Sequence, residues 1–141
     1  MRNSFLTLVL VIALTLTSLV GAVNDNGVDV LINSVEINGD DVLVGSPILV
    51  DKGDTLNIRV GITANLNRVE DLELDAKISG YEYSDNDNLY DSTSLFDVPA
   101  GTTKYVNLEI GLPRDMEGYV YTLRLRLLDQ NGAELLTERT L

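Results

Sequence analysis

The sequence lacks three residue types altogether: its 141 residues include no cysteine, no histidine and no tryptophan. Without cysteine and histidine, the chain cannot build a Ser-His or Cys-His nucleophile pair, a zinc or iron site with nitrogen or sulfur ligands, or a disulfide. The chemistry that remains open to it is that of carboxylates.

Positive charge is also scarce. The chain has 10 Lys and Arg against 22 Asp and Glu, which gives a net charge of −12. Such a chain offers few basic side chains to phosphate groups, so we expect it to bind neither nucleic acid nor an anionic membrane surface. Its 45% hydrophobic and 23% charged residues are ordinary for a packed protein, and its length fits one domain.

The N-terminal residues 1–22 form a separate unit. Arg2 supplies one positive charge, and residues 5–20 are then uncharged and mostly apolar. This pattern predicts a secretory signal peptide with cleavage after Ala22, followed by a short linker at residues 23–27. The alternative is an uncleaved membrane anchor, because the uncharged run has about the 20 residues that a helix needs to cross a bilayer. In both cases we expect the rest of the chain to be exported.

From residue 28 onward, apolar and polar residues alternate with a period of two. That period places one face of each strand in a core and the other in water. Turn sequences such as Asn38-Gly39 separate the strands, and no long stretch has the 3.6-residue period of a helix. The core predicted from strand phase comprises Leu56, Ile58, Val60, Leu74, Ile78, Leu108, Ile110, Leu123 and Leu125.

This pattern predicts an all-β fold, an immunoglobulin-like antiparallel β-sandwich of seven to eight strands over residues 28–141. A closed barrel is the alternative, but it would need strands of more even length, whereas residues 80–95 form a long polar excursion. Before the penultimate strand, Tyr119 stands where such domains carry a corner tyrosine, whose hydroxyl bonds back to upstream backbone. Tyr121 then stands where antibody domains carry a cysteine.

The sandwich topology makes a prediction about charges. The strand at 72–79 should pair with the strand at 119–128, so that opposite charges meet across the strands. The outward residues concerned are Glu73, Asp75, Lys77, Arg124 and Arg126. On the other sheet, the same reasoning sets Arg59 beside Glu109.

Three segments together are similar to a known family. The run Val50–Val60, the segment Val98–Thr103 and the strand Gly118–Arg124 resemble CARDB-type and S-layer-associated immunoglobulin-like modules of archaeal and bacterial surfaces. The resemblance extends over about residues 28–141 and consists mainly of turn chemistry before strands. It implies a sandwich used in cell-surface structure or adhesion, and it implies no catalytic residues.

We therefore expect a non-catalytic structural or adhesive module of a prokaryotic, and more narrowly archaeal, cell envelope or S-layer. An exported domain without disulfides favours this source. The expected partners are cell-envelope proteins or surface glycans, and the expected membrane contact is through the N-terminal segment if it stays uncleaved. The alternative function is a calcium-dependent or glycan-binding secreted module.

One polar loop has the composition of a calcium site. Asp85, Asp87 and Asp91 are closely spaced among amide side chains, and oxygen ligands of this kind are what calcium prefers. The spacing departs from an EF-hand loop, which would need other residues where Leu89 and Tyr90 stand. The alternative is a solvated loop whose Asp and Asn side chains cap turns. We expect no other cofactor.

Three tyrosines offer a second candidate site. Continuing the outward phase of the strand at 72–79 brings Tyr81 and Tyr83 to the solvent face near Tyr90. Tyrosine provides a large apolar contact with a polar tip, which suits sugars and protein partners. The alternative is that the loop at 84–94 folds over these rings as a small cluster of its own.

Enzymatic activity is not expected. Glycoside hydrolysis would need two carboxylates flanking a cleft, one of them with a pKa raised by burial. The acidic residues are instead scattered over turns and outward strand positions, so the sequence selects no such pair.

Overall fold

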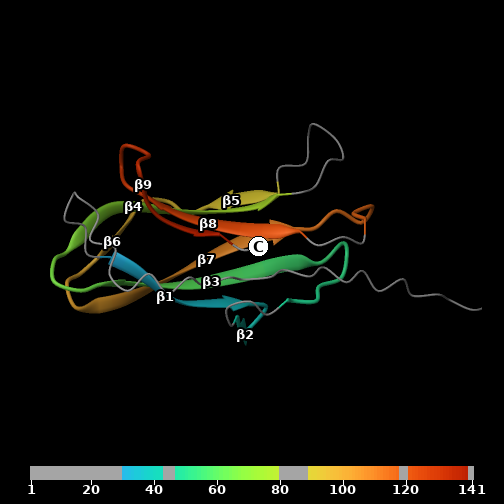
Figure 1. Cartoon of the computed structure of the whole chain (residues 1–141), viewed down its shortest axis with the longest axis horizontal. Helices are drawn as coiled ribbons and strands as arrows, with labels where there is room; N and C mark the ends of the chain where they lie inside the picture. The colour runs from blue at the N-terminus through green and yellow to red at the C-terminus, as the bar shows by residue number, and fades with distance from the viewer. Residues whose placement is uncertain (1–29, 43–46, 80–88, 118–120, 140–141) are drawn as a thin grey trace, which may run out of the picture.

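The computed structural model describes residues 30–42, 47–79, 89–117 and 121–139, and these form two antiparallel sheets packed face to face (Figure 1). The first sheet has the order β2-β1-β3-β7, with β1 at Val30–Ile37, β2 at Asp40–Asp41, β3 at Thr55–Ala64 and β7 at Thr102–Gly111. The second sheet has the order β5-β4-β8-β9, with β4 at Val69–Ser79, β5 at Tyr90–Ser92, β8 at Thr122–Leu128 and β9 at Glu134–Arg139. A short strand, β6 at Phe96–Val98, also pairs with β4. Over these ranges there is no helix that is long and apolar enough to cross a membrane.

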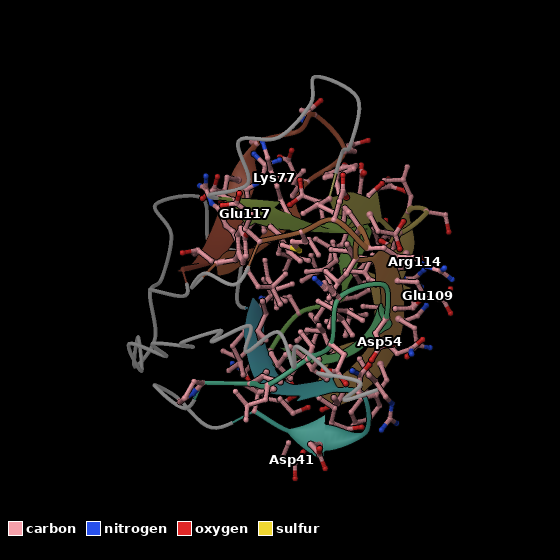
Figure 2. All side chains as sticks on the ribbon, turned by 90° about the vertical axis from the view of Figure 1, so that its right-hand side faces the viewer. Asp41, Asp54, Lys77, Glu109, Arg114 and Glu117 are labelled. Atoms are coloured by element: carbon pink, nitrogen blue, oxygen red, sulfur yellow. The ribbon has the colours of Figure 1, made fainter. Side chains whose placement is uncertain are left out.

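The core lies between the sheets, as the period of two predicts. All nine residues that strand phase assigns to the core are at most 4% exposed, which confirms that prediction. Charged side chains stand on the outside: Lys77 and Asp41 lie at opposite outer sides of the sandwich, with the apolar side chains between the two sheets (Figure 2). Burial of alternate residues from both sheets is thus what joins them.

The strand order is immunoglobulin-like. The chain switches sheets between β3 and β4, and it switches again on entering β7 and β8. As expected, β4 pairs with β8, with Lys77 opposite Arg124 and Ile78 opposite Leu123. The described residues form nine strands, where the sequence predicted seven to eight, and the three shortest are β2, with two residues, and β5 and β6, with three each.

The predicted hairpin and closing turn are both present. Asn38 and Gly39 adopt positive φ angles of 54° and 89°, the backbone conformation that a tight hairpin turn requires. Before β9, the carboxylate of Asp129 accepts hydrogen bonds from the backbone N–H groups of Asn131, at 2.9 Å, and Ala133, at 2.8 Å. Local sequence therefore fixes these turns through residues that stabilise their own backbone.

In the described residues, the tyrosine whose hydroxyl bonds back to upstream backbone is Tyr121, whereas the prediction from sequence placed Tyr119 in this role. The Tyr121 hydroxyl donates a 3.0 Å hydrogen bond to the carbonyl oxygen of Glu117, and the residue is 3% exposed. Because β8 begins at Thr122, Tyr121 shares the inward phase of Leu123 and can reach the preceding backbone. Tyr119 lies outside the described residues.

The charge predictions hold in part. Arg126 forms an ion pair with Asp75 across β8 and β4, with a 2.9 Å hydrogen bond from Nε to Oδ1. Arg124, however, contacts Glu134 of β9 at 3.3 Å, because its direct neighbour on β4 is the like-charged Lys77.

Two further predictions about charged residues are wrong. Arg59 stands opposite Asn107 and forms its ion pair with Glu36 of β1, at 2.9 Å, while Glu109 stands opposite Asn57. The long connection between β3 and β7 leaves their register to the packed core, so local sequence does not fix it. Asp75, expected in solvent, is 1% exposed.

Candidate functional site

The predicted calcium and tyrosine sites lie largely outside the described residues. This applies to Asp85, Asp87, Tyr81 and Tyr83, so both sites stay predictions. Tyr90 is described: it is 43% exposed and stands opposite Lys77 at the edge of the second sheet.

Asp91 joins the two sheets. Its Oδ2 accepts a 2.7 Å hydrogen bond from the backbone N–H of Glu109 in β7, and its Oδ1 accepts one from the N–H of Ser92. Glu109 lies at the side of the sandwich where β7 runs (Figure 2). Asp91 thus satisfies a backbone donor on an edge strand, which helps to protect that edge. In the part of the chain that the structure describes, no group of three or more acidic residues is arranged to hold a metal ion.

A different set of residues comes together on the outer face of the first sheet. The pairing of β1 with β3 shifts register between Ile32 and Ser34, so Asn33 is the extra residue of a β-bulge. On β3, the bulge faces Gly61, whose neighbour on β7 is Tyr105. Bulges and strand-interior glycines both mark places where a sheet departs from regular packing to aim side chains or to admit another group.

Gly61 is required by its neighbours. A Cβ atom at this position would lie 2.5 Å from Asn33 Oδ1 and closer still to Ser34 Oγ, and it would lie 3.1 Å from Cε1 of Tyr105. The bulge side chains and the tyrosine ring therefore occupy the space above the glycine.

Two threonines extend this arrangement along the face. Thr63 and Thr103 stand opposite each other on β3 and β7, and their hydroxyl oxygens lie 2.7 Å apart. The Asn33 amide Nδ2 donates to Thr63 Oγ1 at 2.9 Å and to Thr103 Oγ1 at 3.4 Å. One side chain of the bulge thus links three strands through uncharged hydrogen bonds.

On the side of Gly61 away from the threonines, this arrangement is bordered by the ion pair of Arg59 and Glu36. The guanidinium carbon of Arg59 lies 4.1 Å from the centroid of the Tyr105 ring, and Arg59 Nη1 donates a 2.9 Å hydrogen bond to Glu36. Tyr105 nevertheless remains 48% exposed. Stacking on the guanidinium holds the ring in place without covering it. We call the whole set the polar platform: Asn33, Ser34, Gly61, Thr63, Thr103 and Tyr105, bordered by Arg59 and Glu36.

Sequence reasoning missed this platform because its residues come from three strands that are distant in the chain. Two signals were present. Gly61 interrupts the polar phase of its strand, and Tyr105 places an aromatic ring in the polar phase of another. Either signal alone fits an ordinary strand, and the tertiary register brings them together.

The outer face of the second sheet has a different electrostatic character. The hydrogen bond that Arg126 donates to the Asp75 carboxylate raises the pKa of Arg126 above its ordinary value, although partial burial opposes this shift. Glu134 lies close enough to add to the same effect while it contacts Arg124. Asp75, Arg124, Arg126 and Glu134 of this face are therefore engaged with one another.

At the end of the sandwich, hydrogen bonds lower the pKa of one further carboxylate, that of Asp97. The backbone N–H of Asp71 donates to Asp97 Oδ1 at 3.1 Å, and Arg68 donates to Oδ2 at 2.6 Å. Both hydrogen bonds lower the pKa of the Asp97 carboxyl, and the one from the Asp71 backbone has the larger effect. Asp71 has a positive φ of 55° in the irregular part of β4, so Asp97 stabilises that bend from β6.

Comparisons with known proteins identify no family for this chain. No protein-family model matches the sequence, and no curated protein matches it. Among solved structures, the chain is similar to Spo0M, a sporulation control protein from Bacillus subtilis, with 12% identity and a TM-score of 0.47. The match covers 79% of this chain and 48% of that protein, so this chain matches about half of its length.

Proposed function

We propose that the protein is an exported, non-catalytic module that acts by adhesion or assembly at the cell envelope of a prokaryote, and more narrowly of an archaeon. The observation that carries this proposal is the polar platform, because it presents hydrogen-bonding side chains and an exposed aromatic ring on a rigid sheet. Sites built on strands hold their geometry better than sites on loops.

Two features of the sequence support the cellular setting. The uncharged N-terminal run after Arg2 has the character of an export signal. The resemblance to CARDB-type surface modules points to the same role.

The experiment is a cosedimentation assay. The protein is produced from the full-length gene, purified as the cell releases it, and mixed with envelope fragments of the source organism. We expect the protein to sediment with the fragments, and the Tyr105→Ala variant to bind about tenfold more weakly, as for the loss of a central aromatic contact. Tyr90→Ala distinguishes the platform from the tyrosine site predicted from the sequence, because Tyr90 is similarly exposed on the other sheet, and this variant should bind as the unmodified protein does. Failure of the unmodified protein to sediment with the envelope would refute the proposed function.

A further inference from the structure

We infer that the ligand of the polar platform is a neutral glycan, bound across β1, β3 and β7 with Tyr105 as its aromatic contact. This inference rests on the proposed function, because it names the partner of the same site. Three properties of the platform support it: its unused hydrogen-bonding capacity, its lack of net charge and its preformed shape.

The unused capacity follows from counting donors and acceptors. Thr63 and Thr103 share one hydrogen bond, so one of the two hydroxyl hydrogens is left to donate. Asn33 Oδ1 accepts from Ser34 Oγ at 3.4 Å and has a second lone pair. The platform therefore offers a donor and an acceptor side by side. A sugar hydroxyl both donates and accepts, so neighbouring hydroxyls of a glycan match this pattern.

The charge of the platform favours a neutral ligand. Its hydrogen-bonding side chains at Asn33, Ser34, Thr63, Thr103 and Tyr105 are uncharged at neutral pH. The bordering charges of Arg59 and Glu36 compensate each other in an ion pair. Although the chain has a net charge of −12, this region attracts neither cations nor anions strongly. Charge complementarity therefore indicates a polar partner without charge.

The aromatic ring supplies the apolar part of the contact. Sugar rings present C–H groups on their faces, and tyrosine can pack against them while its hydroxyl stays hydrated. Arg59 stacks on the Tyr105 ring and is itself held by Glu36, so the ring is oriented before a ligand arrives. A preformed contact of this kind reduces the ordering cost of binding.

A protein partner fits this face less well. Protein interfaces have a largely apolar centre with several aromatic anchors. The centre of the platform is instead built from Asn33, Ser34 and the threonine pair, with one aromatic ring beside them. A second copy of the chain would place this polar centre against itself and leave much of its hydrogen-bonding capacity unmatched.

The test uses the same envelope fragments after mild periodate oxidation, which cleaves the carbon–carbon bond between neighbouring sugar hydroxyls. We expect oxidised envelopes to bind the protein at least about tenfold more weakly than mock-treated ones, because the glycan hydroxyls that pair with the platform are lost. Glycans released from untreated envelopes are then separated by charge. The neutral fraction should compete with envelope binding, and the acidic fraction should not.

Substitutions then assign the site. Thr103→Val keeps the shape of the side chain and removes its hydroxyl, so it should weaken competition by the neutral fraction about tenfold, the upper range for one lost hydrogen bond. Thr122→Val, on the outer face of the second sheet, is the matched control and should have no effect. Tyr105→Ala should weaken the same competition, whereas Tyr90→Ala should not.

Several outcomes would overturn the inference while leaving the proposed function in place. One is envelope binding that withstands oxidation, and another is competition by the acidic fraction alone. Loss of binding in Tyr90→Ala but not in Tyr105→Ala would move the site to the second sheet. Self-association in sedimentation equilibrium that Tyr105→Ala abolishes would assign the face to a second copy of the chain. Failure of the unmodified protein to bind untreated envelopes would instead refute the proposed function itself.

Discussion

The two outer faces of the sandwich are both polar, but they use their polar groups differently. On the second sheet, Arg126 is bound to Asp75 and Arg124 contacts Glu134, so these charges are paired within the protein, although Arg124 Nε is buried without a hydrogen-bond partner. On the first sheet, the platform around Asn33 consists of uncharged groups with donors and acceptors to spare. Composition alone does not distinguish a face that stabilises the fold from one that is open to a ligand. The distinction comes from counting which polar groups already have a hydrogen-bond or ion-pair partner within the protein.

The largest expected effect tests whether the two faces belong to one cooperative unit. Leu123 of the second sheet and Leu108 of the first are both almost fully buried in the shared core. We expect Leu123→Ala and Leu108→Ala each to lower the free energy of unfolding by about 2 to 5 kcal/mol. Urea denaturation followed by circular dichroism measures this. A loss below about 0.5 kcal/mol at either site would show that the sheets do not share one close-packed core.

The next prediction compares the ion pairs of the two faces. Arg126→Met leaves the buried carboxylate of Asp75 without its partner, and we expect a loss of about 2 to 3 kcal/mol, less than for a fully buried pair because Arg126 is partly exposed. Arg59→Met breaks the exposed pair with Glu36 and should cost only about 0.2 to 1 kcal/mol. If the two variants lost equal unfolding free energy in denaturation experiments, the ion pairs of the two faces would not differ in their contribution to stability.

A smaller effect is expected at the centre of the platform. In Gly61→Ala, the new methyl group must displace the side chains of Asn33 and Ser34. Crowding and the better strand propensity of alanine oppose each other, so we expect a net loss of about 1 kcal/mol in unfolding free energy. Envelope binding should fall far more than stability does. Unchanged binding in a stable variant would mean that the geometry around Gly61 does not serve the ligand.

The smallest effect concerns the stability of the fold at acidic pH. It lies at Asp97, away from both outer faces. The pKa of Asp97 is lowered in the folded protein, so its contribution to stability is present above the ordinary carboxyl value of 3.8 and is lost as pH falls through the folded value. We expect the protection factor of the Asp71 amide in hydrogen exchange to fall in that window, since the Asp71 N–H donates to Asp97. Asp97→Asn should remove this pH dependence. A protection factor at Asp71 that stays the same through the window would contradict it.

The sequence predicted the parts of the fold that depend on local chemistry. The period of two identified the buried residues of β3, β4, β7 and β8, because a strand exposes alternate side chains to opposite faces. Asn38-Gly39 and the segment from Asp129 to Gly132 marked real turns, since these residues stabilise turn backbone by themselves. The pairing of β4 with β8 followed from the immunoglobulin-like strand order.

The parts that the sequence missed depend on register between distant strands. Strand phase says which face Arg59 occupies, but it does not say whether Glu36 or Glu109 lies beside it.

By itself, the sequence determined the all-β class, the core and the turns, because each of these is set by residues within a few positions of one another. Only the tertiary structure decided that Asn33, Gly61 and Tyr105 meet on one face and that Asp75 is buried under its partner. The physical reason is that register between strands is chosen by the packing of the whole core, and a shift of two residues preserves the local pattern while it changes every cross-strand neighbour.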